Sequence, residues 1–321
     1  MASKVKLWIA LIVVLYTIGA FCVQQTEEGA QVPKTTEVEE GALEDENPIF
    51  DLSFDDTGHE ITAGNPKRIV SLSPSNTEIL FAIGAKDRVV GVTDFCDYPP
   101  EVLDKVRRGE IQRIGGYSTV NIERVIALKP DLVLASYGNG LGTIETLRRY
   151  TTVLAFDPKD IRGIERSILA IGKATGNYEN AEKLVKEMEE RISKIKAKER
   201  SGKKVVHIIW NDPIFVSGRE TFIDEAISIA GGINAFNFTG WRAISVEDLI
   251  RANPDVIIVS SGSGMGGGRD VVYDWVLSDS RLKGVNAVKN GKVFVIDSDI
   301  ISRPGPRIVE AIEQINEFLS R

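Results

Sequence analysis

The pattern of apolar and polar residues changes several times along the chain. Short apolar runs rich in β-branched residues, such as RIVSL from Arg68, VVGV from Val89 and DLVLAS from Asp131, are typical of buried strands. They alternate with helical patterns such as SPSNTEILFAIGA from Ser73. Strands that alternate with helices predict right-handed crossovers and a mostly parallel sheet. We therefore expect an N-terminal α/β lobe over residues 48–160.

Residues 161–200 carry a longer helical pattern. Its second half has apolar residues at spacings of three and four, which form one stripe on a charged helix: Ala181, Leu184, Val185, Met188, Ile192 and Ile195. The strand and helix alternation then restarts and continues over residues 201–321, with KVVHIIW, VIIVSS and KVFVID as expected strands. The fold class predicted is α/β, with two lobes of mostly parallel sheet joined by a single long rigid α-helix.

One sequence unit occurs once in each expected lobe. YSTVNIERVIALKPDLVLAS begins at Tyr117, and WRAISVEDLIRANPDVIIVSS begins at Trp241. Each copy has an aromatic residue, a glutamate six positions later, an apolar helical pattern, Pro-Asp and a β-branched run. The glutamates are Glu123 and Glu247. A carboxylate near a helix N-terminus stabilises the helix by roughly 0.3 to 1 kcal/mol, which explains either glutamate alone but not the aromatic residue that accompanies it.

The two aromatic residues of the unit are candidates for ligand binding. In open parallel sheets, the loops that leave the carboxyl ends of strands line the crevice where ligands bind. We expect Tyr117 and Trp241 to lie in such loops and to face one another as a clamp for a large, flat ligand. Ordinary core filling is the alternative for each ring.

Further candidates lie at the same expected edge of the sheets. Ser73 is expected to cap a helix that begins at Pro74, where free backbone amides can hold a phosphate or amide oxygen of a ligand. A plain capped helix is the alternative. The other candidate ligand-binding residues are Tyr98, Tyr137, Trp210 and Arg303.

The N-terminus has the pattern of an export signal. Two lysines precede seventeen residues without a charge, so residues 1–23 are expected to be a signal peptide or a membrane anchor. Cys22 is a candidate lipid-attachment site, and cleavage near Ala20 or retention as an anchor are the alternatives. Residues 24–47 hold eight carboxylates and one lysine, and they are expected to form a flexible acidic tether.

The charge of the chain argues against a nucleic-acid partner. The net charge is -7, and the acidic tether alone carries -7. The remaining body is close to neutral and lacks the basic excess that binds a polynucleotide.

Two enzymatic interpretations of the sequence compete with a binding function. GSGMGG at Gly262 to Gly267 follows a strand, as in dinucleotide-binding folds, but the acidic Asp297 follows the first glycine by about 35 residues where about 20 are expected. Hydrolytic chemistry is disfavoured because the chain has only two histidines, His59 and His207, and His207 lies in an apolar strand. The lone thiol of Cys96 is a poor metal ligand, and no metal site or cofactor is expected.

Five segments, in this order, are together specific for one family: RIVSLSPSNTEILFAIGA, GVTDFCDYPPEV, NIERVIALKPDLVLA, AVKNGKVFVID and RPGPRIVEAIEQI. On these segments, the chain from about Asn47 to Arg321 resembles the class III substrate-binding proteins of ABC importers, which bind cobalamin, siderophores and haem. The closest likeness is to the cobalamin-binding proteins. The resemblance implies two α/β lobes bridged by a rigid helix, a ligand in the cleft and little lobe closure.

The resemblance also implies roles for the repeated unit. Glu123 and Glu247 match the positions of glutamates that dock on arginines of the membrane permease. Tyr117 and Trp241 match the positions of aromatic residues that meet the corrin ring, with Tyr117 standing where the first lobe usually has tryptophan. The implied protein is a monomer, tethered to the outer face of the cytoplasmic membrane or periplasmic, that carries cobalamin or another corrinoid to a permease and its ATPase.

The sequence leaves three alternatives to a corrinoid carrier. A siderophore, usually anionic, favours several cleft arginines, of which Arg242 and Arg303 are the obvious ones. Haem requires an axial ligand, for which Tyr98, Tyr117 or Tyr137 is available. A nucleotide-dependent oxidoreductase built on the Gly262 segment is the alternative outside this class.

Overall fold

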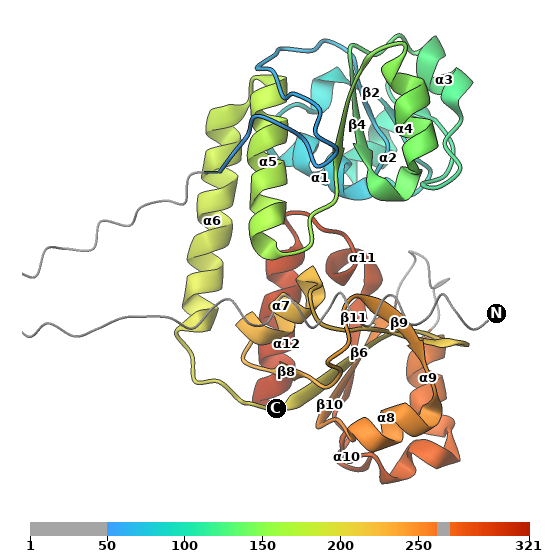
Figure 1. Cartoon of the computed structure of the whole chain (residues 1–321), viewed down its shortest axis with the longest axis vertical. Helices are drawn as coiled ribbons and strands as arrows, with labels where there is room; N and C mark the ends of the chain where they lie inside the picture. The colour runs from blue at the N-terminus through green and yellow to red at the C-terminus, as the bar shows by residue number, and fades with distance from the viewer. Residues whose placement is uncertain (1–49, 262–269) are drawn as a thin grey trace, which may run out of the picture. The chain divides into compact units, whose positions relative to one another are not determined.

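The computed structural model describes residues 50–261 and 270–321. The expected leader, the acidic tether and the Gly262 to Gly267 segment lie outside these residues. Within the described part, no helix combines the length and the apolar character that crossing a membrane requires. The chain folds from Phe50 to Arg321 into two α/β lobes that are connected by helices α5 and α6 (Figure 1).

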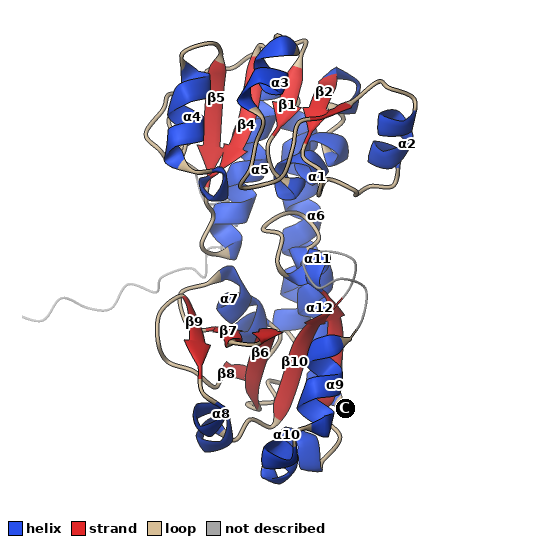
Figure 2. Cartoon of the chain, turned by 90° about the vertical axis from the view of Figure 1, so that its right-hand side faces the viewer, coloured by secondary structure: helices blue, strands red, loops and turns tan. Residues whose placement is uncertain are grey.

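The N-terminal lobe is built on a parallel sheet of five strands in the order β3-β2-β1-β4-β5 (Figure 2). The strands are β1 (Ile69–Ser71), β2 (Val89–Val92), β3 (Gln112–Arg113), β4 (Leu132–Ser136) and β5 (Thr152–Phe156). Its helices are α1 (Pro74–Ala82), α2 (Glu101–Arg107), α3 (Ile122–Ala127) and α4 (Leu141–Arg148). Strands β1, β4 and β5 are almost wholly buried, which explains why their sequences are continuous apolar runs.

The connection between the lobes consists of α5 (Ile161–Thr175) and α6 (Tyr178–Lys196), which lie side by side. Gly176 ends α5 in a left-handed conformation with φ of 68°, which turns the chain back into α6. At Gly172 the two helices approach so closely that an added β-carbon would lie 2.5 Å from Cβ of Ala181. Close packing of this kind stiffens the connection.

The C-terminal lobe contains a mixed sheet in the order β11-β10-β6-β7-β9, with β8 paired to β6. Strands β11, β10, β6 and β8 are parallel to one another, and β7 is antiparallel to β6 and β9. The strands are β6 (Lys204–Asn211), β7 (Ile214–Ser217), β8 (Ile233–Asn234), β9 (Trp241–Ile244), β10 (Val256–Ser261) and β11 (Val293–Asp297). The helices are α7 (Phe222–Ile229), α8 (Val246–Ala252), α9 (Val271–Ser278), α10 (Asn286–Lys289), α11 (Ser298–Ile301) and α12 (Ile308–Ser320).

One hydrophobic core extends through both lobes. It includes Ile79 of α1, Ile168 of α5, Met188 of α6 and Ile312 of α12. Two smaller clusters fill the other faces of the two sheets. Because the core is continuous across the connection, separating the lobes exposes apolar surface, which is unfavourable.

The second half of the repeated unit has a structural role in both lobes. The carboxylate of Asp131 accepts hydrogen bonds from the backbone N–H groups of Lys67 (2.7 Å) and Arg68 (2.9 Å) just before β1. The carboxylate of Asp255 accepts one from the N–H of Lys204, the first residue of β6 (2.9 Å). In both copies, the aspartate of the Pro-Asp pair therefore holds the start of a neighbouring strand through backbone hydrogen bonds.

Candidate functional site

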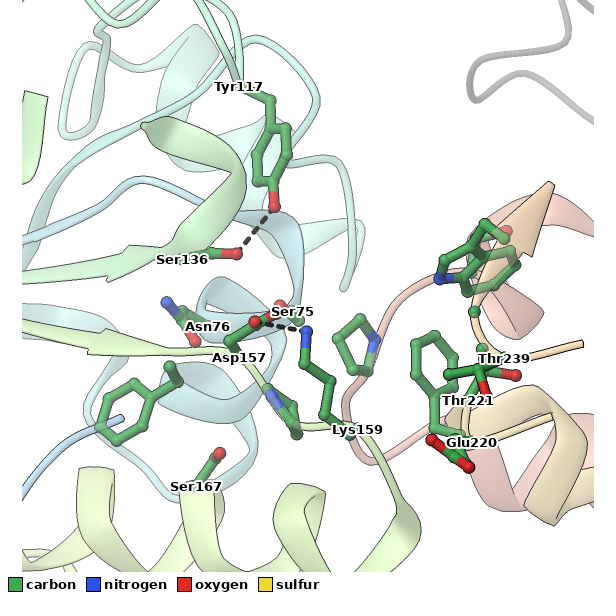
Figure 3. Close-up of a pocket in the computed structure, with 17 residues that line it drawn as sticks. Ser75, Asn76, Tyr117, Ser136, Asp157, Lys159, Ser167, Glu220, Thr221 and Thr239 are labelled. Atoms are coloured by element: carbon green, nitrogen blue, oxygen red, sulfur yellow. Dashed lines mark hydrogen bonds and ion pairs between the residues drawn. The ribbon is translucent and has the colours of Figure 1, made fainter. Parts of the chain in front are cut away.

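A cavity of about 560 Å³ is lined by residues of both lobes (Figure 3). The N-terminal lobe contributes the start of α1, the bend before α3 and the carboxyl ends of β4 and β5. The C-terminal lobe contributes the start of α7, the start of β9 and the segment between α11 and α12. The lining residues are Ser75, Asn76, Tyr117, Ser136, Phe156, Asp157, Pro158, Lys159, Ser167, Glu220, Thr221, Phe222, Thr239, Gly240, Trp241, Ser302 and Pro304.

Tyr117 is held in the cavity wall by its neighbours. Its hydroxyl and the Oγ of Ser136 lie 2.7 Å apart and share a hydrogen bond (Figure 3). The side-chain amide of Asn139 donates to the Tyr117 carbonyl oxygen (2.7 Å). The ring lies so close to Gly138 that an added β-carbon there would overlap it. The ring is therefore positioned rather than free, as a preformed binding surface requires.

Trp241 lines the same cavity from the C-terminal lobe. It begins strand β9, so the expectation that it lies in a loop is wrong: β9 pairs with β7 and leads directly into the cap of α8. The indole is 41% exposed, and its ring meets that of Phe222 edge to face, with centroids 6.1 Å apart. Trp241 and Phe222 together form an aromatic wall, which suits a ligand with a large apolar face.

The remaining lining is mostly neutral and polar. Asp157, Lys159 and Glu220 are its charged residues, and Lys159 forms an ion pair with Asp157. The other polar side chains are hydroxyls and the amide of Asn76, which donates to the carbonyl oxygen of Ala135 (3.0 Å). Such a lining can orient a large ligand through hydrogen bonds, and the ligand need not carry a large net charge.

Sequence reasoning missed several of these lining residues. Asp157 and Lys159 follow strand β5, so the rule that placed Tyr117 near the carboxyl ends of strands also applies to them. Phe222 follows Thr221, whose side chain caps α7 by accepting from the N–H of Asp224 (3.1 Å). The Thr221 cap is a local signal for the N-terminus of a helix. Tertiary packing decides on which face of the lobe that N-terminus lies.

Ser73 caps α1 and Pro74 is its first residue, as predicted. The Oγ of Ser73 is buried and accepts from the N–H of Asn76 (3.2 Å), so it faces its own helix. The next two residues, Ser75 and Asn76, line the cavity instead. The start of α1 thus reaches the cavity, while Ser73 and Pro74 lie behind its surface.

Tyr137 and Trp210 do not line the cavity, although both are partly exposed. The Tyr137 hydroxyl donates to the carbonyl oxygen of Asp56 (3.2 Å), and the indole of Trp210 donates to the carbonyl oxygen of Asp212 (2.9 Å). Tyr98 also lies outside the lining, with the guanidinium of Arg307 stacked 3.9 Å from its ring centre. The structure therefore brings Tyr117 and Trp241 together and leaves these three elsewhere.

Arg303 is not a cleft cation. Its buried guanidinium bonds to the carboxylates of Glu78 (3.0 Å), Asp97 (2.9 Å) and Asp299 (2.8 Å). Burial lowers the pKa of Arg303, but the hydrogen bonds that its guanidinium donates to Asp97 and Glu78 outweigh burial and hold the pKa above its ordinary value. Arg242, the other candidate arginine, stacks on the Phe238 ring and is also outside the lining.

Glu123 and Glu247 are exposed residues at the second position of α3 and α8, as predicted. The helix caps are supplied by other residues: Asn121 accepts from the N–H of Arg124 (2.9 Å), and Ser245 forms a capping box with Asp248. Neither glutamate is needed to complete a cap, so both carboxylates are presented to solvent at one end of each lobe.

His207 and Cys96, whose side chains could take part in chemistry, are both core residues. His207 is buried, as its apolar strand predicts, with Nε2 2.8 Å from the Oγ of Ser260 in a hydrogen bond, and burial lowers its pKa to about 3. Cys96 is buried beside the hydroxyls of Thr77 and Thr93, and burial raises the pKa of its thiol. Over residues 50–261 and 270–321, no cluster of three or more metal-ligating side chains occurs.

Comparison with known proteins decides the family. The sequence model of the periplasmic binding protein family matches residues 69–300. The chain belongs to this family. An ABC transporter substrate-binding lipoprotein of Bacillus subtilis, the uncharacterised YvrC, is 30% identical over 333 residues, which cover 99% of this chain and 98% of that protein. The chain is thus an ABC-type substrate-binding protein of the extracytoplasmic class, and the proteins of this family are transport components.

Two solved structures show the same two-lobed fold. The periplasmic vitamin B12-binding protein BtuF of Vibrio cholerae matches with a TM-score of 0.66 and 27% identity, over 79% of this chain and 97% of that chain. The periplasmic haem-binding protein RhuT from Roseiflexus matches with a TM-score of 0.68 and 27% identity, over 80% and 98%. The predicted fold class is confirmed, and the chain lies in the group that includes corrinoid and haem carriers.

Proposed function

We propose that this protein captures cobalamin or another corrinoid in the cavity between its lobes and delivers it to an ABC permease and its ATPase. The main support is that Tyr117 and Trp241, which occupy equivalent positions in the repeated unit, line one cavity. Two aromatic faces from opposite lobes suit a large ring with flat, partly apolar surfaces. The likeness to the Vibrio cholerae vitamin B12-binding protein supports the same ligand class.

The cavity lining argues against an anionic siderophore. Ferric siderophores are bound most effectively by arginines that fork onto their oxygens. Arg303 is occupied by three carboxylates and Arg242 lies on an aromatic ring outside the cavity. Lys159 is the one cation among the lining residues, and Asp157 and Glu220 outnumber it.

Haem is the second candidate ligand. Tyr117 places a phenol in the cavity, and the Roseiflexus haem-binding protein has the same fold. A phenolate of Tyr117 would have to leave Ser136 to ligate iron, whereas a corrinoid needs no ligand from the protein. Among the lining residues there is no histidine, cysteine or methionine to replace it.

We propose that Glu123 and Glu247 dock the loaded protein on the permease. Both carboxylates are exposed, one in each lobe, at the same position of equivalent helices. A pair of separated charges fixes the orientation of a partner and speeds its encounter more than it adds affinity. The proposal places ligand binding and docking on different residues.

We also propose that the protein is held at the outer face of the membrane through Cys22. The relative YvrC, which is named a lipoprotein, aligns with 99% of this chain. Palmitate labelling of growing cells tests the assignment: label should enter the full chain and be absent from Cys22→Ser. Label that persists in Cys22→Ser, or is absent from both, contradicts it.

Ligand titration of the protein tests the proposed function directly. Quenching of tryptophan fluorescence can be followed with cyanocobalamin, haemin, a ferric siderophore and NAD, because Trp241 is in the cavity wall. Cyanocobalamin should saturate at the lowest concentration. If haemin binds more tightly than cyanocobalamin, haem is the ligand. Tight binding of NAD alone contradicts the transport function.

A further inference from the structure

A buried group of charged side chains joins the two lobes beside the cavity. Glu78 lies on α1 in the N-terminal lobe, and Arg303 and Arg307 lie between α11 and α12 in the C-terminal lobe (Figure 1). Arg307 donates to both carboxylate oxygens of Glu78 (2.8 and 2.9 Å), and Arg303 donates to one of them (3.0 Å). Forked bonds of this kind fix geometry more strictly than a single ion pair.

Further bonds complete the group on both sides. From the N-terminal lobe, Asp97 accepts from Arg303 (2.9 Å), and the carbonyl oxygen of Phe95 accepts from the same guanidinium (3.2 Å). From the C-terminal lobe, Asp299 lies 2.8 Å from Arg303. Glu78 and Arg303 are 4% and 9% exposed. Buried ion groups add little net stability, and in some proteins they select one arrangement of the parts that they join.

The group is attached to two pieces of the cavity wall. On α1, Glu78 lies three residues after Ser75 and two after Asn76, which line the cavity. In the C-terminal lobe, Arg303 stands between Ser302 and Pro304, which also line it. These pieces touch: a β-carbon added to Gly305 would lie 3.6 Å from Cβ of Ser75.

The group supplements an apolar interface between the lobes. Ile79 follows Glu78 on α1 and Ile308 follows Arg307 at the start of α12, and both isoleucines belong to the core that extends through both lobes. Apolar packing is non-directional, whereas forked hydrogen-bonded ion pairs fix distances and angles, so the group can hold one orientation of α1 against the residues before α12.

We propose that Glu78, Asp97, Asp299, Arg303 and Arg307 form an interlobe clasp that holds the cavity at its binding width before the ligand arrives. The clasp residues position the walls and need not touch the ligand. The link to binding rests on the proposed function, whereas the effect on lobe geometry does not. The clasp assigns to Arg303 and Glu78 a role that the cavity lining alone does not reveal.

The distance between the lobes in the ligand-free protein tests the clasp. Spin labels at Ala127→Cys on α3 and Ser278→Cys on α9, both exposed, report this distance in a Cys22→Ser background, because Cys96 is fully buried. Glu78→Gln keeps the shape and removes the charge. Arg307→Lys keeps the charge and removes the fork, and it serves as the second variant should Glu78→Gln unfold.

Glu313→Gln is the matched control. It breaks another forked Arg–Glu pair, that between Arg191 of α6 and Glu313 of α12 (2.7 and 2.9 Å), which lies outside the cavity lining. The expected result is one narrow distance population for the parent and Glu313→Gln, and a broader or shifted population for the clasp variants. Populations that match in all four proteins overturn the clasp, whatever the ligand is.

Ligand affinity gives the second readout on the same variants. If opening leaves about one molecule in ten binding-competent, the Kd for cyanocobalamin rises about tenfold, with thermal unfolding of the variant still cooperative. A broadened distance population with an unchanged Kd overturns the link to binding and leaves the lobe geometry established. Absence of cyanocobalamin binding in the parent contradicts the proposed ligand, not the clasp.

Discussion

Tyr117 and Trp241 occupy equivalent positions in two copies of one sequence unit and line the same cavity from different lobes. The rest of the unit serves the fold: its caps begin α3 and α8, and its Pro-Asp pairs fasten neighbouring strands. Helix formation and strand capping do not require an aromatic residue at this place. The paired rings are therefore the part of the repeat that ligand binding explains best.

Replacement of the Trp241 ring should weaken ligand binding. In Trp241→Ala the cavity loses a face of its aromatic wall, and we expect the Kd for cyanocobalamin to rise by more than about tenfold, as for other central aromatic contacts. Trp210→Ala is the control, because Trp210 is equally exposed but lies outside the lining. Isothermal titration calorimetry measures both; equal losses in the two variants would show that Trp241 has no special role.

Removal of the two carboxylates proposed for docking should separate binding from transport. Glu123→Ala combined with Glu247→Ala is expected to leave the Kd for cyanocobalamin unchanged and to abolish uptake of labelled cobalamin by cells, because neither residue lines the cavity. The control is Glu187→Ala with Glu190→Ala, two exposed glutamates of α6. Lower ligand affinity in the first pair, or normal uptake, contradicts docking through these residues.

The local elements of the fold follow from local patterns. Ser73, Asn121 and Ser245 each cap a helix where a small polar residue precedes an apolar periodic run. The parallel strands are continuous apolar runs because helices or neighbouring elements cover both faces. These features depend on a few adjacent residues, so the sequence predicts them well.

Features that depend on distant partners were not predictable in this way. Arg303 meets Glu78, 225 residues earlier in the chain, and nothing near either residue marks the pair. Strand β9 also escaped prediction, because its residues WRAI are exposed or partly exposed and show no apolar alternation; pairing with β7 makes it a strand. Tertiary contacts override weak local preference in both cases.

Glu165 should make the protein less stable as the pH rises. Burial, together with Glu189 and Glu225, raises the pKa of Glu165 from 4.5 to about 7. Between these values the folded protein binds more protons than the unfolded chain, so the free energy of unfolding falls as pH increases, by on the order of 1 kcal/mol per pH unit from this residue. Urea unfolding should show that Glu165→Gln reduces this fall and that the exposed Glu187→Gln does not; two identical profiles would contradict the raised pKa.

His207 should destabilise the protein on the acid side. Burial lowers its pKa from 6.5 to about 3, so the unfolded chain binds a proton that the folded protein does not. The free energy of unfolding therefore has its full value above about pH 6.5. It falls as the pH decreases towards 3, by up to about 1.4 kcal/mol per pH unit from this residue. His207→Gln should flatten this part of the profile, and His59→Gln, which changes the other histidine, should leave it intact. An acid limb that survives in His207→Gln assigns the loss to other groups.

The crystal structure of the protein with cyanocobalamin, phased to locate the cobalt by its anomalous scattering, tests the central claim most directly. We predict one cobalt peak inside the cavity, between the rings of Tyr117 and Trp241, with the corrin ring in van der Waals contact with both. A cobalt peak on another surface, or a corrin ring that contacts neither aromatic side chain, contradicts the claim that the repeated unit exists to hold this ligand.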